Sequence, residues 1–288
     1  MLSKHPRQLA IAVFLITQSA LAHGAAAAER IVALGGTVTE IVFALGAGAS
    51  VVGVDSSSVH PAEVAGLPIV GYQRRLAAEG VLSLAPTRVL ATDESGPPAA
   101  ITQIRDAGVE VAVFKAAESA DGAMRLIRDI AAALGRAARG EELVAQLTAD
   151  LRGAGEAVAA DGPRPRVLFI YARGPGTLSV AGRHTGADEM IRLAGATNAA
   201  ADFDGFKPLS AEGVVAAAPE VVLMLSRGVD SLGGRDAALD LPGVMRTPAG
   251  ASRRLVVMDD LYLLGFGPRM GRAVRELAVA VRAPAPGN

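Results

Sequence analysis

The chain of 288 residues contains no cysteine and no tryptophan, and its only lysines are Lys4, Lys115 and Lys207. Without cysteine it can form no disulfide framework, thiolate metal site or lipid-modified cysteine. Aromatic residues make up 3% of the sequence, which argues against a sugar site lined with aromatic rings. The formal net charge of −1 argues against a nucleic-acid partner, because nucleic-acid-binding surfaces are strongly basic.

The familiar catalytic motifs are absent as well. The sequence contains no G-x-S-x-G, no H-E-x-x-H and no P-loop. Beyond the first 28 residues the only histidines are His60 and His184, which argues against a zinc or manganese site built from clustered histidines and carboxylates. No spacing pairs a nucleophile with a base. We therefore expect that the protein is not an enzyme.

Residues 1–28 have the pattern of a secretion signal peptide. Lys4 and Arg7 form a basic head, and residues 9–16 form an apolar run that is too short to span a bilayer. Two runs of small residues then offer alternative cleavage sites. An uncleaved membrane anchor is the other interpretation of this segment. Together with the absence of cysteine, the pattern predicts a soluble protein of the bacterial periplasm.

The sequence carries one motif twice. The form A-E-G-V-x-x-x-A-P-x-x-V-L describes residues 78–90 and residues 211–223, and Glu79 and Glu212 occupy the same place in it. The repeat predicts two lobes of the same topology, each with one carboxylate at an equivalent point. Such a pair suits a partner with two-fold symmetry. The alternative is that each glutamate only stabilises the first turn of its helix, by about 0.3–1 kcal/mol.

Short apolar segments alternate with helical segments before and after a long helical stretch. Strands at residues 30–34, 51–54, 88–91 and 109–114 alternate with helices and predict parallel βαβ units. The pattern restarts with a strand at residues 167–171. We therefore expect an α/β fold in which two Rossmann-like lobes are joined by a single long backbone helix. In the first lobe, Thr37 is expected to cap a helix over residues 38–45, with Glu40 at its third position.

The order of these predicted segments sets the expected domain boundaries. They are a signal peptide at 1–28, an N-terminal lobe at 29–117, a connecting backbone helix at 118–162 and a C-terminal lobe at 163–288. Gly135 and Gly140 are the expected kinks or breaks in the helical stretch. Because a helix must break backbone hydrogen bonds to bend sharply, we expect only small movements of the lobes on binding.

The segment from Gly71 to Leu76 contains Tyr72, Arg74 and Arg75, and it follows a short strand at the place where an open α/β lobe usually binds its ligand. Tyrosine is a known ligand of haem iron. Ferric iron favours the phenolate form, and in an extended segment Arg74 would lie on the same side as Tyr72 and stabilise that anion. Arginines also pair with carboxylates by forked hydrogen bonds. The spacing alone favours the alternative, in which Tyr72 is a half-buried packing residue and the arginines are solvated.

Several segments resemble those of one protein family. Residues 35–40, 52–56, 70–74 and 78–84 look like the haem-binding members of the periplasmic binding proteins with a helical backbone, which are the substrate-binding subunits of haem ABC importers. In the second lobe, residues 206–212 and 267–269 extend the resemblance. It covers essentially the whole mature chain, and its specific haem signal is the element Gly-Tyr-x-Arg at residues 71–74.

The resemblance implies roles for particular residues. Tyr72 would coordinate ferric haem and Arg74 would support it. Apart from the resemblance, Arg74 and Arg75 are candidates to pair with the haem propionates, and so are Arg173 and Arg227 at strand ends of the second lobe. Some members of the family have a histidine in the loop after the first strand of the second lobe. Here that loop contains Tyr171-Ala172-Arg173-Gly174, with no histidine, so one five-coordinate haem is expected rather than two haems.

The resemblance also implies that Glu79 and Glu212 dock onto arginines of the permease in the inner membrane. The predicted function is therefore a monomeric periplasmic haem carrier that does not itself span the membrane and that delivers haem to an ABC importer. The nearest alternative is a carrier for another iron chelate or for cobalamin on the same fold. Siderophore sites need tryptophan, which is absent, and cobalamin would leave Tyr72 and Arg74 unexplained. An enzyme on this scaffold and a haem-responsive signalling module are further alternatives.

Overall fold

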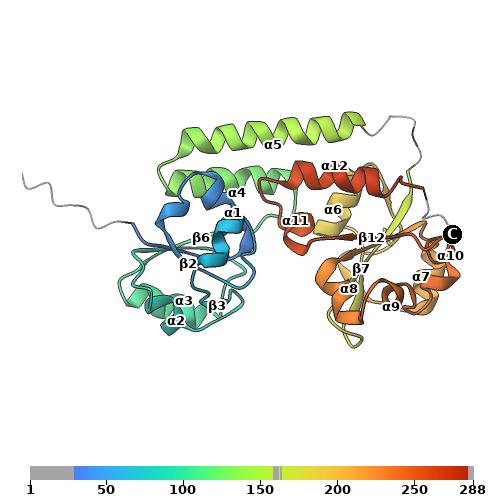
Figure 1. Ribbon diagram of the computed structural model, residues 1–288, viewed down its shortest axis with the longest axis horizontal. Coiled ribbons are helices and arrows are strands. Elements are labelled where there is room, and N and C mark those ends of the chain that lie inside the picture. Colours follow the sequence, from blue (N-terminus) through green and yellow to red (C-terminus); the bar gives the residue numbers. More distant parts are fainter. Residues whose placement is uncertain (1–28, 158–161, 163, 285–288) are drawn as a thin grey trace, which may run out of the picture.

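The computed structural model describes residues 29–157, 162 and 164–284. The predicted signal peptide at 1–28 and the end of the predicted connecting helix lie outside the described residues. Figure 1 shows two α/β lobes side by side, with helices running along one side of both lobes. Within the described ranges, none of the helices combines the length and the apolar character that a bilayer-spanning segment requires.

The first lobe is built on a four-stranded parallel sheet with the strand order β2-β1-β5-β6. Its elements are β1 (Ile31–Ala33), α1 (Gly36–Ala44), η1 (Gly48–Ser50), β2 (Val51–Val54), η2 (Ala62–Gly66), β3 (Gly71–Tyr72), β4 (Arg75–Leu76), α2 (Ala78–Leu82), β5 (Arg88–Thr92), α3 (Pro98–Asp106) and β6 (Glu110–Phe114). The parallel βαβ units predicted for this half of the chain are confirmed.

The second lobe repeats this arrangement and adds to it. Its elements are β7 (Arg166–Ala172), β8 (Leu178–Ala181), α6 (Gly186–Leu193), β9 (Thr197–Asn198), β10 (Phe206–Pro208), α7 (Ala211–Ala217), β11 (Val221–Leu225), α8 (Ser226–Leu232), α9 (Arg235–Leu239), η3 (Val244–Arg246), α10 (Pro248–Ala251), β12 (Leu255–Met258), α11 (Asp260–Leu264) and α12 (Met270–Ala280). The parallel strands β9, β7, β11 and β12 correspond in order to β2, β1, β5 and β6. The antiparallel strands β8 and β10 are an addition that the sequence did not predict.

The helical stretch after β6 consists of two helices, α4 (Ala120–Ala133) and α5 (Ala137–Ala157). Of the two predicted breaks, only Gly135 is one, and its φ of +64° is a conformation that most other residues avoid. Gly140 lies inside α5, where a Cβ atom would come within 2.5 Å of the Cβ of Ala131 on α4. The two helices therefore pack closely, and α5 is the one that runs on toward the second lobe (Figure 1).

One hydrophobic core runs through both lobes and the backbone helices. It includes Ile41 of α1, Leu126 of α4, Leu147 of α5, Phe169 of β7 and Leu277 of α12, all of which are fully buried or nearly so. Spreading the lobes widely would expose part of this shared core to water. The expectation of small lobe movements stays a prediction, and the shared core gives a second physical reason for it.

Two side chains of α1 join the lobes directly. The prediction that Thr37 caps this helix was wrong, because α1 begins at Gly36 and no side chain caps it. The Oγ1 atom of Thr37 instead donates to the carbonyl oxygen of Gly265, at 2.6 Å. Glu40, which is buried, accepts two hydrogen bonds of 2.9 Å from the guanidinium of Arg269. The helix that opens the first lobe is thus bound to the loop between α11 and α12 of the second.

Candidate functional site

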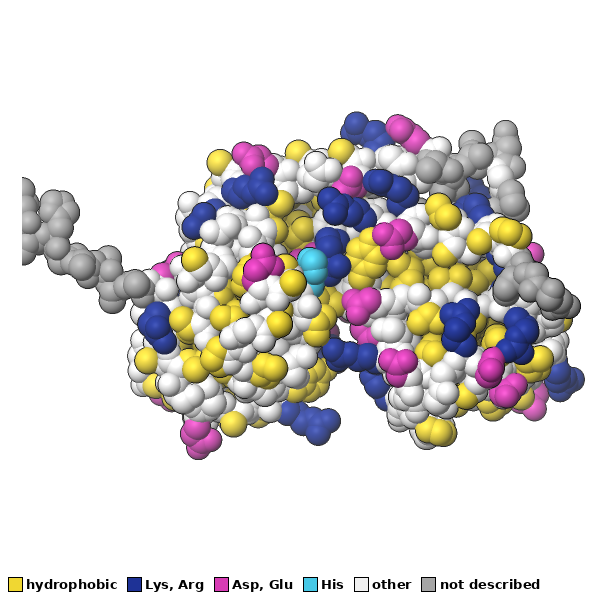
Figure 2. Space-filling model, viewed as in Figure 1, with side chains coloured by type: hydrophobic (Ala, Val, Ile, Leu, Met, Phe, Trp, Pro, Cys, Tyr) yellow, Lys and Arg dark blue, Asp and Glu magenta, His cyan; other side chains and the backbone are white. Residues whose placement is uncertain are grey.

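A cleft of about 450 Å³ lies between the two lobes. This volume is in the usual range for small-molecule sites, about 300–1,000 Å³. Much of the first lobe's wall follows the carboxyl ends of parallel strands, at Gly35 after β1, Glu94 after β5 and Ala116 after β6. Figure 2 shows a notch in the surface between the lobes, with Lys or Arg side chains beside it. The ligand crevice expected at this sheet edge is therefore present.

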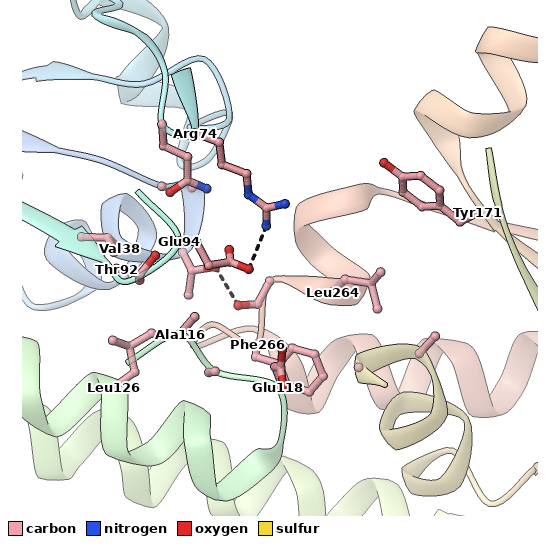
Figure 3. Close-up of a pocket in the computed structure, with 18 of the residues that line it drawn as sticks. Val38, Arg74, Thr92, Glu94, Ala116, Glu118, Leu126, Tyr171, Leu264 and Phe266 are labelled. Carbon is pink, nitrogen blue, oxygen red and sulfur yellow. Dashed lines mark hydrogen bonds and ion pairs between the residues drawn. The ribbon is translucent and has the colours of Figure 1, made fainter. Parts of the chain in front are cut away.

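The cleft has both apolar and charged walls. Its apolar lining side chains come from both lobes and the backbone helices; they are Val38, Leu126, Phe206, Leu264 and Phe266. Its charged lining side chains are Arg74, Glu94 and Glu118. In Figure 3, Arg74 and Tyr171 lie on opposite sides of the cleft, with Phe266 on the side nearer the backbone helices. The cleft can therefore hold an apolar ligand that also carries charged groups.

Tyr72 lies on a small β-hairpin of the first lobe, formed by β3 and β4. The extended conformation expected for residues 72–74 was wrong, because Gln73 and Arg74 form the turn, and Tyr72 pairs with Arg75 across it. Tyr72 is 40% exposed, and its hydroxyl group makes no hydrogen bond to any described residue. The phenol is therefore not a buried packing residue and is available to a ligand.

Arg74 extends from the turn of this hairpin into the cleft, where its guanidinium binds the carboxylate of Glu94 at 2.8 Å (Figure 3). The pKa of Arg74 is raised above its usual value, chiefly by this hydrogen bond, and the charges of Tyr72 and Tyr171 act in the same direction. In the ligand-free cleft the positive charge of Arg74 is therefore paired with Glu94.

Tyr171, at the end of β7, lines the wall of the second lobe, and sequence reasoning missed it as a site residue. The signal that could have found it is the spacing Tyr-x-Arg, which joins Tyr171 to Arg173 just as it joins Tyr72 to Arg74. The guanidinium of Arg173 lies 4.8 Å from the centre of the Tyr171 ring and binds Asp260 at 2.8 Å. Each lobe therefore carries a tyrosine two residues before an arginine. Of these four residues, Arg74 and Tyr171 line the cleft, whereas Tyr72 and Arg173 are not among the side chains that line it.

Three of the predicted propionate contacts, Arg75, Arg173 and Arg227, are not among the side chains that line the cleft. Arg75 is an exposed residue of β4. Arg227 is exposed on α8, and its backbone N–H donates to Asp260 at 3.3 Å. Their proposed roles, and that of Arg173, stay predictions.

The third tyrosine of the chain, Tyr262 on α11, is unsuited to act as a phenolate. Its hydroxyl donates to Glu276 at 2.9 Å. Burial first, and then this carboxylate, raise the pKa of Tyr262 to about 12. It packs against the core and is not among the side chains that line the cleft.

Glu79 and Glu212 occupy equivalent places in the two lobes. Each is the second residue of a short helix, α2 or α7, and each helix is followed by a central strand, β5 or β11. Both side chains are exposed, and neither forms an ion pair with any residue that the structure describes. The structural repeat predicted from the sequence is confirmed, while a docking role stays a prediction.

Within residues 29–157, 162 and 164–284, no group of three histidine, aspartate or glutamate residues is arranged to hold a metal ion directly. A phenol can bind a metal that arrives inside a larger ligand such as haem. The phenol of Tyr171 lines the cleft, and that of Tyr72 is exposed on the hairpin whose turn residues line it.

The sequence pattern of the family described as "Periplasmic binding protein" matches residues 31–262 of this chain. Among solved structures, the periplasmic haem-binding protein RhuT from Roseiflexus sp. RS-1 is 50% identical, with 88% of this chain and 98% of that chain covered and a TM-score of 0.85. The periplasmic haem-binding protein BhuT, solved with two haems, is 43% identical, with 88% and 97% covered and a TM-score of 0.82.

A cobalamin-binding protein from Halobacterium salinarum is 29% identical over 260 residues, which cover 88% of this chain and 69% of that protein. The matches with RhuT and BhuT extend over both lobes and confirm the helical-backbone fold and the resemblance described from the sequence.

Proposed function

We propose that this chain, which belongs to the periplasmic binding protein family, binds haem in the cleft between its lobes and delivers it to an ABC importer of the inner membrane. The observation that carries the proposal is a cleft lined by Arg74 of one lobe and Tyr171 of the other, with Tyr72 exposed on the hairpin that bears Arg74, in a chain similar to haem-binding proteins. Haem is the cargo, and no reaction is part of the proposal.

Tyr72 is the proposed ligand of ferric haem iron. Its hydroxyl has no hydrogen-bond partner to give up among the described residues, whereas the hydroxyl of Tyr262 is held by Glu276. Ferric iron is a hard cation that favours the phenolate oxygen. Arg74 follows at the turn of the same hairpin and extends into the cleft, where it is proposed to support the bound ligand with its positive charge.

The cleft offers the macrocycle an apolar surface. Val38 lines it from the first lobe and Leu126 from α4, and Phe206, Leu264 and Phe266 line it from the second lobe. Burial of apolar area contributes roughly 25 cal/mol per Å² before the costs of association are subtracted. Contact with a flat apolar ring therefore supplies affinity that does not depend on the iron.

The propionate groups carry two negative charges and require cations near the mouth of the cleft. The proposed partners are Arg74, Arg75 and Arg227. The guanidinium groups of Arg75 and Arg227 form no ion pair with any described residue, and that of Arg74 pairs only with the half-exposed carboxylate of Glu94. Arg173 is the weakest of the four predicted contacts, since Asp260 already binds it. A guanidinium binds a carboxylate through two parallel hydrogen bonds.

The number of haems is a separate proposal. We keep one haem per chain, bound by Tyr72, although BhuT was solved with two. Tyr171 places a second phenol on the opposite wall, so loss of iron binding in Tyr171→Phe and a second equivalent of haemin in titration would overturn this part of the proposal.

Delivery requires contact with the importer. Glu79 and Glu212 are proposed to bind arginines of the permease, because they are exposed, equivalent in the two lobes and unpaired among the described residues. The protein is further proposed to act as a monomer in the periplasm after cleavage of its signal peptide. Similarity to proteins described as periplasmic supports the compartment.

Cobalamin is the second candidate ligand, because a relative that is 29% identical is a cobalamin-binding protein. The discriminating experiment is titration of the purified mature protein with haemin and, separately, with cyanocobalamin. We expect haemin to give the absorption spectrum of a ferric tyrosinate complex, and cyanocobalamin to give no binding.

The variants Tyr72→Phe and Tyr262→Phe sharpen this test. Tyr72→Phe should lose the tyrosinate spectrum, whereas Tyr262→Phe, the matched control, should keep it. A haemin spectrum that is the same in wild type and Tyr72→Phe would refute the assigned ligand, and tight binding of cyanocobalamin alone would refute haem as cargo.

A further inference from the structure

Asp55 is a completely buried carboxylate at the end of β2, in the first lobe. Its two oxygens accept hydrogen bonds from Gly35, Ser57, Ser58 and Gln73. The backbone N–H groups donate at 2.9 Å from Gly35, 3.1 Å from Ser57 and 3.2 Å from Gln73. The hydroxyl groups of Ser57 and Ser58 lie within 2.8–3.0 Å. A buried carboxylate with this many donors is satisfied as an anion and acts as a fixed point in the loop.

One of these donors belongs to the hairpin that carries the proposed iron ligand. The N–H that donates to Asp55 belongs to Gln73 and lies in the peptide group that joins Gln73 to Tyr72. Arg74 is the next residue along the chain. The carbonyl oxygen of Gln73, on its next peptide group, accepts from the N–H of Gly96 at 2.8 Å. The turn residue Gln73 is therefore held from both sides, by Asp55 and by the loop after β5.

The hairpin itself cannot supply this order. It consists of two residue pairs, Gly71 with Leu76 and Tyr72 with Arg75. An isolated hairpin is at best marginally stable in water, even when it is longer than this. Its orientation therefore depends on bonds to the rest of the lobe. Apart from the exposed ion pair between Arg74 and Glu94, the bond from the Gln73 N–H to Asp55 is the one with a charged acceptor among the described residues. Hydrogen bonds with an ionised partner are about twice as strong as neutral ones.

We infer that Asp55 is a positioning residue for ligand coordination: by holding the Gln73 N–H it fixes the directions in which Tyr72 and Arg74 leave the hairpin. This inference rests on the proposed function. It also gives a reason for an aspartate directly after β2, in a segment whose sequence was noted only for its resemblance to a family.

A pair of substitutions at Gln73 isolates the single hydrogen bond. Gln73→Pro and Gln73→Ala both remove the glutamine side chain, but only proline removes the N–H that donates to Asp55. Proline also places a ring carbon where the N–H points, against the Asp55 oxygen that accepts it at 3.2 Å, so the thermal unfolding of both Gln73 variants is measured beside their binding. The Gln73 N–H takes no part in the pairing of the hairpin, so its loss leaves β3 and β4 paired.

We expect Gln73→Pro to bind haemin about tenfold more weakly than Gln73→Ala and to show a weaker tyrosinate band. Gln73→Ala should stay within about twofold of wild type, because the hydrogen bond to Asp55 remains. Equal affinity and equal spectra in the two variants would overturn the inference.

A second pair of variants tests the carboxylate. Asp55→Asn should speed hydrogen exchange of the Gln73 N–H about tenfold in the ligand-free protein and weaken haemin binding by a similar factor. Asp188→Asn is the control, because Asp188 also accepts a backbone N–H, that of His184, and a side-chain N–H, that of Asn198, but lies in the second lobe. It should change neither quantity.

The possible results separate this inference from the proposed function. Faster exchange at Gln73 with unchanged haemin binding and spectrum would overturn the positioning role while leaving haem as cargo. A wild-type protein without a tyrosinate spectrum would refute the assigned ligand and this role together. If Asp55→Asn fails to fold, as its thermal unfolding would reveal, the comparison of the two Gln73 variants decides the matter.

Discussion

The substitution Arg269→Met tests how the two lobes are held together. Arg269 binds Glu40 of the other lobe through two hydrogen bonds of 2.9 Å, and its guanidinium lies 4.9 Å from the centre of the Tyr262 ring. The Glu40 side chain is 6% exposed and that of Arg269 is 26% exposed. Methionine keeps much of the apolar stem of Arg269 and removes its charge, which leaves the carboxylate of Glu40 buried without a partner.

The cost follows from this burial. Removal of one partner from a fully buried ion pair costs about 3–5 kcal/mol. Because Arg269 is partly exposed, water can reach the site, and we reduce the expected cost to about 2–3 kcal/mol. For a protein of this size, each kcal/mol lowers the melting temperature by about 2–4 °C, so we expect a fall of roughly 4–12 °C. Differential scanning calorimetry of the ligand-free protein measures it.

Arg275→Met is the matched control. Arg275 is also on α12, but its side chain is 48% exposed and its closest contact with Asp150 is 3.5 Å. Asp150 is 14% exposed, but it also accepts from the side chain of Gln146 at 3.1 Å and so keeps a partner when Arg275 is replaced. We therefore expect a loss of about 0–1 kcal/mol and a fall in melting temperature of no more than about 4 °C. The double variant Glu40→Gln with Arg269→Met should regain part of the loss, since no unpaired buried charge remains. Equal melting temperatures for Arg269→Met and Arg275→Met would refute the reasoning.

Three further predictions concern the cleft, the docking surface and the backbone helices. Glu94→Gln releases Arg74 from its ion pair and removes a negative charge from the cleft. Haemin should therefore bind about two- to fivefold more tightly in titration, and weaker binding would contradict this. Glu79→Ala combined with Glu212→Ala should abolish haem uptake by cells without changing haemin affinity, and unchanged uptake would remove the docking role. Gly140→Val forces a side chain against α4 and should cost about 1–3 kcal/mol by urea unfolding, whereas Gly153→Ala on the same helix meets open space and should be neutral or stabilising.

The lobe topology could be predicted from the sequence because it depends on local patterns. Short apolar runs separated by helices predicted the parallel strands of both lobes except the two-residue β9, and the repeated motif placed Glu79 and Glu212 at equivalent points. The break at Gly135 followed from its residue type. Gly140 was misread as a possible break, because its role is to let another helix approach, and that contact with Ala131 is not a local property.

Contacts between distant residues explain what the sequence could not predict. Thr37 and Glu40 have the spacing of helix-capping residues, yet their partners are 228 and 229 residues away in the other lobe. The hairpin at Tyr72 lacks the Asn-Gly or Asp-Gly pair that predicts a hairpin turn from sequence, and it depends on hydrogen bonds to Asp55 and Gly96. Tertiary hydrogen bonds determine these features, so periodicity carries no signal for them.

The candidate site was predictable in part. Tyr72 was chosen for its chemistry and its place in the chain, and Arg74 does extend into the cleft. Tyr171 was not predicted as a site residue, although it has the same Tyr-x-Arg spacing as Tyr72 in the sequence. The ion pair between Arg173 and Asp260 joins residues 87 positions apart, so it could not be predicted from local sequence.

The most direct test of the central claim is a crystal structure of the mature protein loaded with haemin. The account predicts that the phenol oxygen of Tyr72 is bonded to the iron, with the guanidinium of Arg74 beside it and the macrocycle between the walls of the two lobes. Iron bonded to another group, with the Tyr72 oxygen turned toward solvent, would contradict the account.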